Sequence, residues 1–297
     1  MYKKNLLHKL TYYLIRASIV LFSLLPFKVV KGIARSFGWL LIHFFPYRKD
    51  IIQNNLSKAL PNADALKIKE ITTNYYQHLS DLLFETIKGI SLNKAQLKDN
   101  FVCTNPEIFT PYIRNGQSCL LIGSHYNNWE LGCMVFPLWV AYPTYTVYKP
   151  MSNPYMDTYF NSWRSKWGMN MVPMTQIGRT LIEKRDEASI FLFVADQSPA
   201  STKHAIWANF FNRQTPFIHG VERIARKTNY PIFYFSIKKR QWGKYEFTIK
   251  QIPYDNKASY GTLTKEYVKI LEQEIKNKPE KWLWSHRRWK RAEQFLS

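Results

Sequence analysis

The chain has 297 residues, 46% hydrophobic and 16% aromatic, which is enough apolar material for a sizeable core and excludes a disordered protein. Its formal net charge of +21 leaves three classes of partner: nucleic acid, an anionic membrane surface and acidic proteins. The three cysteines have neither a disulfide pattern nor zinc-binding spacing. We therefore expect reduced core cysteines in a cytoplasmic protein, and no metal site.

The first 49 residues carry nine Lys or Arg and no Asp or Glu, among long apolar stretches. The cleanest apolar run, 17–27, is about 11 residues long, whereas a bilayer crossing needs about 20. This combination predicts a membrane-anchoring helical segment over residues 1–46, either one short span or a helix lying in the interface. A pair of core helices is the alternative. We expect the catalytic domain to occupy residues 47–297.

Beyond this segment, helical patterns cover residues 47–90, and from about residue 100 strand-like apolar runs alternate with amphipathic segments. Strands are predicted at 119–122, 145–148, 170–173, 189–195, 231–238 and 245–252. Helices are predicted at 129–140, 154–167, 178–185, 219–228 and 262–276. Such alternation indicates an α/β fold with a central, mostly parallel sheet flanked by helices.

The most informative stretch surrounds His125. A short apolar strand, 120–122, is broken by Gly-Ser at 123–124, and an amphipathic helix begins near Asn128. His125 thus lies at the carboxyl end of a strand, where open α/β sheets place their chemistry, and Glu130 lies one turn into the helix. We predict that Glu130 holds one imidazole nitrogen and leaves the other free as a general base. The competing interpretation is a capping histidine and an unrelated surface glutamate.

A second polar group, Asp196 and Gln197, directly follows the buried strand 189–195, on the sheet edge where His125 should also lie. Basic residues occur on loops and helix starts at the same edge, where they can bind phosphate. Backbone N–H groups at the helix start near Asn127 and Asn128 would stabilise an oxyanion. The predicted substrate-binding residues are Asn128, Lys149, Arg164, Arg179, Asp196 and Gln197.

The C-terminal stretch 282–290 interleaves tryptophan with basic residues. Such a pattern suits either stacking on nucleic-acid bases or a position at the lipid headgroups. No RNA-binding or zinc-finger motif accompanies it, so we do not expect a nucleic-acid partner.

The His-x4-acid spacing of His125 and Glu130 resembles the motif of glycerolipid-type acyltransferases, and further short motifs in a fixed order narrow the resemblance. Together they are similar to the lipid A late acyltransferases, the lauroyl/myristoyl transferase family, over about residues 5–292. The motifs are 47–56, Tyr148-Lys149-Pro150, Asn153-Pro154, Arg164 with Trp167-Gly168, Gly178-Arg179, Asp196-Gln197, Phe210-Phe211, Thr215-Pro216 and 284–288.

This resemblance implies transfer of an acyl chain from acyl carrier protein to a hydroxyl of a lipid A precursor, at the cytoplasmic face of the inner membrane. No cofactor is implied beyond the acyl-carrier-protein co-substrate. His125 matches the general base and Glu130 its orienting acid, while Arg164 and Asp196 match recurrent site positions. Residues 198–202 depart from the family's glycine-containing loop. Another lysolipid or aminolipid acceptor, or a non-catalytic lipid-binding protein, therefore stays open.

Overall fold

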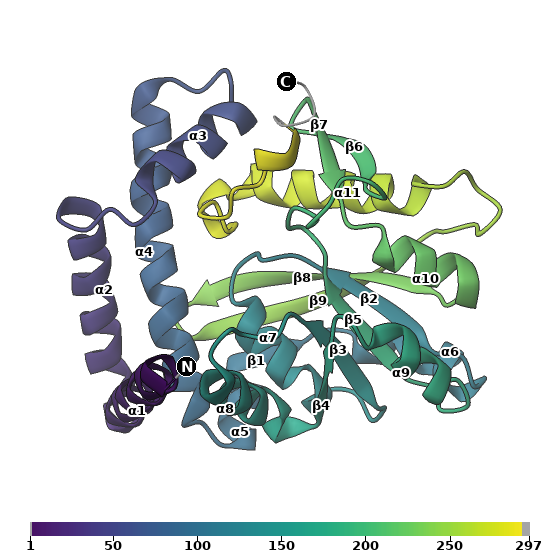
Figure 1. Cartoon of the computed structure of the whole chain (residues 1–297), viewed down its shortest axis with the longest axis horizontal. Helices are drawn as coiled ribbons and strands as arrows, with labels where there is room; N and C mark the ends of the chain where they lie inside the picture. Colours follow the sequence, from purple (N-terminus) through teal and green to yellow (C-terminus); the bar gives the residue numbers. More distant parts are fainter. Residues whose placement is uncertain (1, 293–297) are drawn as a thin grey trace.

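The structure, a computed structural model, describes residues 2–292, with side chains from residue 5 onward. A seven-stranded sheet runs through its centre in the order β1-β9-β8-β2-β5-β3-β4 (Figure 1). All neighbouring strands are parallel except β8 and β9, which form a hairpin. The strands are β1 (Phe101–Cys103), β2 (Cys119–Gly123), β3 (Thr144–Tyr148), β4 (Met169–Pro173), β5 (Ile190–Val194), β8 (Ile232–Gln241) and β9 (Lys244–Ile252). The predicted mostly parallel α/β sheet is confirmed.

Helices cover both faces of this sheet (Figure 1). One face packs against α3 (Lys49–Ala59), α4 (Ala65–Ile90), α9 (Ile177–Glu183), α10 (Gly220–Thr228) and α11 (Thr262–Asn277). The other face packs against α5 (Lys94–Asn100), α6 (Thr110–Arg114), α7 (Trp129–Val135) and α8 (Pro154–Arg164). Short 3-10 turns are η1 (Pro106–Phe109), η2 (Phe136–Leu138), η3 (Ser165–Trp167) and η4 (Pro279–Lys281).

Two differences from the predicted elements have local causes. The helix predicted over 129–140 ends its α-helical part at Val135, because Pro137 lacks the N–H that the next turn needs. A two-stranded hairpin, β6 (Ile206–Phe210) and β7 (Arg213–Phe217), was not predicted. Its turn uses Phe211 at φ 53° and Asn212 at φ 57°, and a bulky aromatic residue gives no signal for that left-handed conformation.

The N-terminal helices α1 (Tyr2–Leu24) and α2 (Phe27–His43) pack beside α4. On α2, Val30, Ala34 and Gly38 are buried, and Ser80 of α4 donates a hydrogen bond to the Ala34 carbonyl at 2.6 Å. In the part of the chain that the structure describes, no helix combines the length and apolarity needed to cross a bilayer. The predicted short membrane span therefore finds no support. The boundary expected after residue 46 lies between α2 and α3, and a division into two domains stays a prediction.

Candidate active site

The carboxyl ends of β2 and β5 bring His125 and Asp196 together. These strands are parallel neighbours, so the residues that follow each of them emerge at the same sheet edge. The His125 Nδ1 lies 2.6 Å from Asp196 Oδ1, and the His125 backbone N–H donates to Asp196 Oδ2 at 3.1 Å. The indole N–H of Trp282 donates to the same Oδ2 at 2.7 Å. The carboxylate is thus held on both oxygens.

The charge state of Asp196 follows from these contacts. Its side chain is only 2% exposed, and burial alone would raise its pKa. The positive charge available on His125 and the hydrogen bonds from His125 and Trp282 outweigh burial and lower the pKa of Asp196 below its ordinary value. An ionised Asp196 accepts the Nδ1 proton, and the Nε2 lone pair of His125 is then the basic one.

Gln197 contacts that second imidazole nitrogen. Its side-chain amide nitrogen donates to His125 Nε2 at 3.1 Å, and the Trp129 ring meets the imidazole edge-on at 5.0 Å between centroids. The imidazole itself is 17% exposed. A substrate hydroxyl must therefore replace the Gln197 amide before it can give its proton to His125.

The expected contact between Glu130 and His125 is wrong: the carboxylate beside the imidazole is that of Asp196. Glu130 forms an ion pair with Arg164 instead, which joins the first turn of α7 to the end of α8. Burial would lower the pKa of Arg164, but the hydrogen bond and charge of Glu130 outweigh it and raise that pKa. His125 stays beside β5 at the strand end, whereas Glu130 points from the helix toward α8, so the two side chains diverge.

The two asparagines between them have structural partners. The Asn128 side chain is the N-cap of α7: its amide oxygen accepts a hydrogen bond from the Leu131 N–H at 3.1 Å. Asn127 adopts φ 51°, and its N–H donates to the Lys281 carbonyl at 2.9 Å. That N–H is occupied, so Asn127 does not supply the oxyanion donor expected there.

Two predicted substrate-binding residues lie apart from this cluster. Lys149 follows β3 and is exposed, and Arg179 on α9 has an 82% exposed side chain that pairs with Glu183. Within residues 5–292, neither hydrogen-bonds or ion-pairs with His125 or Asp196. A role for either in binding substrate stays a prediction.

In the C-terminal stretch 282–290 the tryptophans and Arg288 are buried, which overturns both surface roles predicted for the aromatic rings, whereas Arg287 and Lys290 are exposed. Trp282, Trp284, Trp289 and Arg288 are at most 2% exposed, so their rings meet neither bases nor headgroups. The Arg288 guanidinium lies 4.2 Å from the centre of the Phe217 ring, and burial lowers its pKa to about 10. Trp282, which orients Asp196, is the site residue that the sequence pattern did not indicate.

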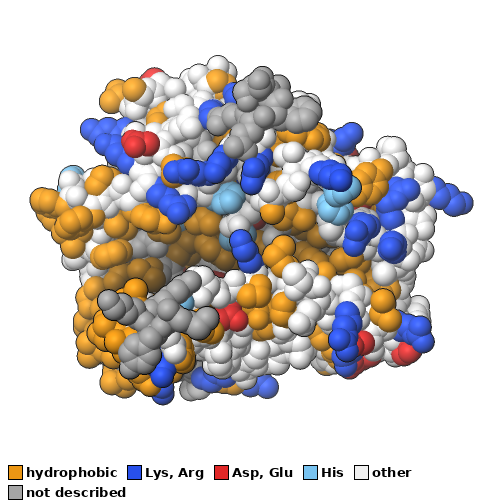
Figure 2. Space-filling view, viewed as in Figure 1, with side chains coloured by type: hydrophobic (Ala, Val, Ile, Leu, Met, Phe, Trp, Pro, Cys, Tyr) orange, Lys and Arg blue, Asp and Glu red, His pale blue; other side chains and the backbone are white. Residues whose placement is uncertain are grey.

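A hollow with hydrophobic side chains on its walls opens on the face shown in Figure 2, between the N-terminal helices and the carboxyl ends of the strands. Lys and Arg side chains gather along its upper side (Figure 2). An imidazole held by a carboxylate and a hollow with apolar walls suit proton abstraction from a hydroxyl beside a hydrocarbon chain.

Comparison with known proteins agrees with this chemistry. A sequence model of the bacterial lipid A biosynthesis acyltransferases matches residues 1–291. The chain is 22% identical over 277 residues to the lipid A biosynthesis lauroyltransferase of Escherichia coli K12, covering 90% of this chain and 87% of the relative. It is 21% identical over 272 residues to the lipid A biosynthesis palmitoleoyltransferase of the same organism, covering 90% and 86%.

A lipid A biosynthesis acyltransferase of Shigella flexneri is likewise 21% identical over 272 residues. The match extends from α1 to the buried tryptophans and so includes every residue of the His125 cluster. The chain therefore belongs to the bacterial lipid A biosynthesis acyltransferase family and is an acyltransferase.

Proposed function

We propose that the protein moves a fatty acyl chain from an acyl-carrier-protein thioester to a hydroxyl of a lipid A precursor, at the cytoplasmic face of the inner membrane. His125 is the general base, and neither a metal nor a cofactor takes part. The observation that carries the proposal is the Asp196 carboxylate on His125 Nδ1, because it makes Nε2 the proton acceptor. The excess of positive charge, +21, suits an acidic carrier protein and an anionic membrane.

The reaction needs one proton relay. The acceptor hydroxyl replaces the Gln197 amide at Nε2 and gives its proton to His125 while its oxygen attacks the thioester carbonyl. The tetrahedral intermediate collapses, the carbon–sulfur bond breaks, and the thiolate takes the proton back from the imidazolium. Asp196 stabilises the imidazolium between these two steps. The Arg164–Glu130 ion pair ties the first turn of α7, the helix that begins just after His125, to the end of α8 and so holds the backbone beside the general base in place.

The ion pair gives a prediction for a double-mutant cycle. Glu130→Gln and Arg164→Gln should each lower kcat/KM by about tenfold or more, since each leaves a half-buried charge without its partner. The double variant should be no worse than the poorer single variant, because the two side chains act as a unit. Steady-state kinetics measure the cycle, with circular dichroism as the folding control. Additive losses would contradict a shared role.

The acceptor is tested in cells. Mass spectrometry of total lipid should show one lipid A species lacking a single acyl chain both in a deletion strain and in a strain carrying His125→Ala. Loss of a chain from another lysolipid or aminolipid would support the alternative acceptor that residues 198–202 leave open. A deletion without any lipid change would favour a non-catalytic lipid-binding protein.

Membrane association is proposed through a surface on α1 and α2, which we call the apolar N-terminal surface. Its exposed large hydrophobic side chains are Leu6, Leu7, Leu10, Tyr13, Leu14, Val20, Leu21, Leu24, Phe27, Val29, Trp39 and Leu40. Basic residues lie among them and there are no acidic ones, as in helices that lie in a membrane interface.

Glutamate at Leu10 and Leu14, which are 55% and 60% exposed, should weaken binding to anionic vesicles at least about tenfold, because two apolar contacts are lost and two repulsive charges gained. Co-sedimentation with phosphatidylglycerol vesicles measures the effect. The matched control is Leu66→Glu with Ile182→Glu, two exposed apolar residues on α4 and α9. Equal losses in both double variants would contradict a dedicated surface.

A further inference from the structure

A basic pocket lies between α2, α4, the end of β8 and η4. Its volume is about 1150 Å³, a size that suits a small-molecule headgroup. Seven cationic side chains line it against three acidic ones, an excess of four positive charges. The cations are Lys31, Arg35, Lys238, Lys239, Arg240, Lys278 and Lys281, and the acids are Asp81, Glu274 and Glu280.

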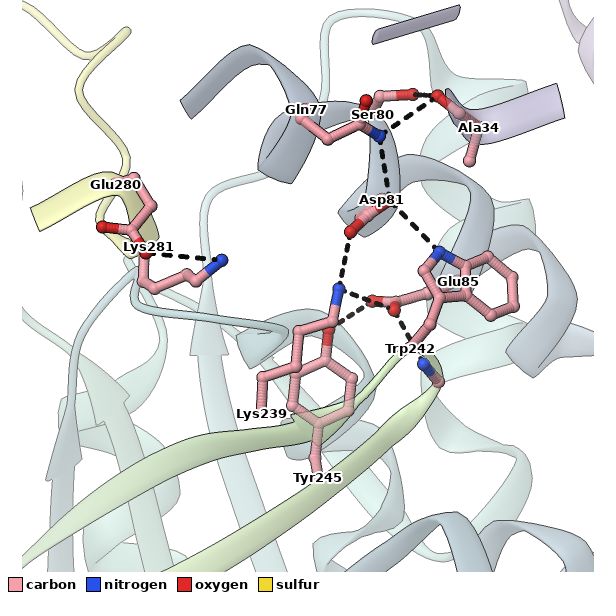
Figure 3. A network of polar contacts seen from close by, with 11 residues as sticks. Ala34, Gln77, Ser80, Asp81, Glu85, Lys239, Trp242, Tyr245, Glu280 and Lys281 are labelled. Atoms are coloured by element: carbon pink, nitrogen blue, oxygen red, sulfur yellow. Dashed lines mark hydrogen bonds and ion pairs between the residues drawn. The ribbon is translucent and has the colours of Figure 1, made fainter. Parts of the chain in front are cut away.

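One wall of the basic pocket is a fixed polar network (Figure 3). Lys239 lies 2.8 Å from Asp81 and 2.8 Å from Glu85, and the Trp242 indole N–H donates to Asp81 at 3.2 Å. Glu85 also accepts from the Tyr245 hydroxyl. These contacts neutralise Lys239 and tie α4 to the β8–β9 hairpin, so the wall is already built before a ligand arrives.

Most other cations of the basic pocket lack a counter-charge. Within residues 5–292, Lys31, Arg35, Lys238 and Lys278 form no ion pair. Lys281 extends from η4 toward the space beside α4 (Figure 3), its Nζ 3.7 Å from the Glu280 carboxylate. Burial and the charge of Lys239 lower the pKa of Lys281, and burial raises the pKa of Glu274 to about 7. A concave site with unpaired cations is an anion site.

The position of the basic pocket links it to the reaction. Tyr126 and Asn127, which directly follow His125, form part of its lining. Since consecutive Cα atoms are about 3.8 Å apart, the Cα atoms of these two lining residues lie within about 8 Å of the His125 Cα. On the other side Trp39, 53% exposed and part of the apolar N-terminal surface, also lines the pocket. A ligand in the basic pocket would thus lie between the two residues that follow His125 and the apolar N-terminal surface.

We propose that the basic pocket binds a phosphate group on the sugar headgroup of the acceptor lipid and thereby positions its hydroxyl at His125. This inference rests on the proposed function, because it names the part of the acceptor that the protein recognises. Arg35 offers the planar donor pair that suits phosphate oxygens, and Lys31 and Lys238 add point charges. An acidic carrier protein is too large for a concave space of this volume.

The test compares two triple variants with equal charge change. Lys31→Gln/Arg35→Gln/Lys238→Gln removes pocket cations, and Lys227→Gln/Lys250→Gln/Lys257→Gln removes three exposed cations on α10, β9 and the following loop. Both are assayed in neutral detergent micelles with a phosphorylated and an enzymatically dephosphorylated acceptor glycolipid. We expect the pocket variant to raise KM for the phosphorylated acceptor at least about tenfold, with kcat within about twofold. Dephosphorylation should raise KM for the wild type and the control only.

Other outcomes overturn the proposal in distinguishable ways. A higher KM for acyl carrier protein alone would make the basic pocket a carrier-docking site. An unchanged KM in micelles with weaker binding to anionic vesicles would assign it to membrane phospholipid, and competition by inorganic phosphate without dependence on the acceptor's phosphate would assign it to free anion. If the wild type does not acylate the acceptor, the proposed function fails. Calorimetric titration of the phosphorylated glycolipid into both variants then tests phosphate binding by the basic pocket independently of catalysis. Binding at least tenfold weaker in the pocket variant than in the control supports the proposal, and equal binding refutes it.

Discussion

His125→Ala is expected to lower kcat/KM for acyl transfer at least about 100-fold, because the proposed mechanism makes His125 the group that takes the hydroxyl proton during attack on the thioester. The loss should lie in kcat more than in KM, since the imidazole contributes to the transition state more than to binding. Transfer of a labelled acyl chain from carrier protein to acceptor lipid measures both constants.

The matched control is His204→Ala, which removes an exposed histidine on the segment before β6 and should leave kcat/KM within about twofold. Circular dichroism should show both variants folded, since the His125 side chain is itself partly exposed. Full activity of His125→Ala would place the base elsewhere and reduce His125 to a structural residue.

Asp196→Asn is expected to lower kcat by about 100-fold or more while preserving shape. An asparagine amide can donate to His125 Nδ1, and this favours the tautomer with its proton on Nε2, which cannot accept another. The lowered pKa of Asp196 means that the wild-type carboxylate is ionised above its ordinary pKa of 3.8, and its stabilising contribution is lost only as the pH falls through the lower folded-state value. Assays from pH 6 to 9 therefore compare an ionised Asp196 beside His125 in the wild type with a neutral asparagine in the variant.

A graded companion to this variant is Trp282→Phe, which removes one of the donors to Asp196 Oδ2 but keeps the carboxylate. It should cost less activity than Asp196→Asn, about tenfold, and should move the acidic limb of the pH–rate profile. If Asp196→Asn retains wild-type kcat and an unchanged profile, Asp196 only holds the loop, and the tautomer argument is wrong.

The sequence predicts the sheet well because its inner strands are continuous apolar runs. β2 and β5 are buried on both faces, so their runs at 119–122 and 189–195 signal strands clearly. β1 escapes prediction because it has three residues, and β6–β7 because Phe211 turns where glycine or asparagine is usual. The inner strands can therefore be identified from their apolar runs alone, whereas β1 and the β6–β7 hairpin leave no such signal in the sequence.

The sequence predicts which residues lie at the shared edge of the sheet, but not which of their side chains contact one another. His125, Asp196 and Gln197 each follow an apolar strand, which is why a shared sheet edge was foreseeable. Which acid meets the imidazole depends instead on the direction of each side chain, and spacing along the chain favours Glu130 although Asp196 is the neighbour. Trp282 reaches the site through tertiary packing alone, and neighbouring residues carry no sign of that contact.

The most direct measurement is a transfer assay with purified protein, an acyl carrier protein bearing a labelled acyl chain, and a lipid A precursor in micelles. The proposed function predicts a new ester on the precursor, one acyl chain heavier by mass spectrometry, formed by the wild type and reduced at least about 100-fold with His125→Ala. Absence of this product with wild-type protein, or its undiminished formation by the variant, would contradict acyl transfer with His125 as the base.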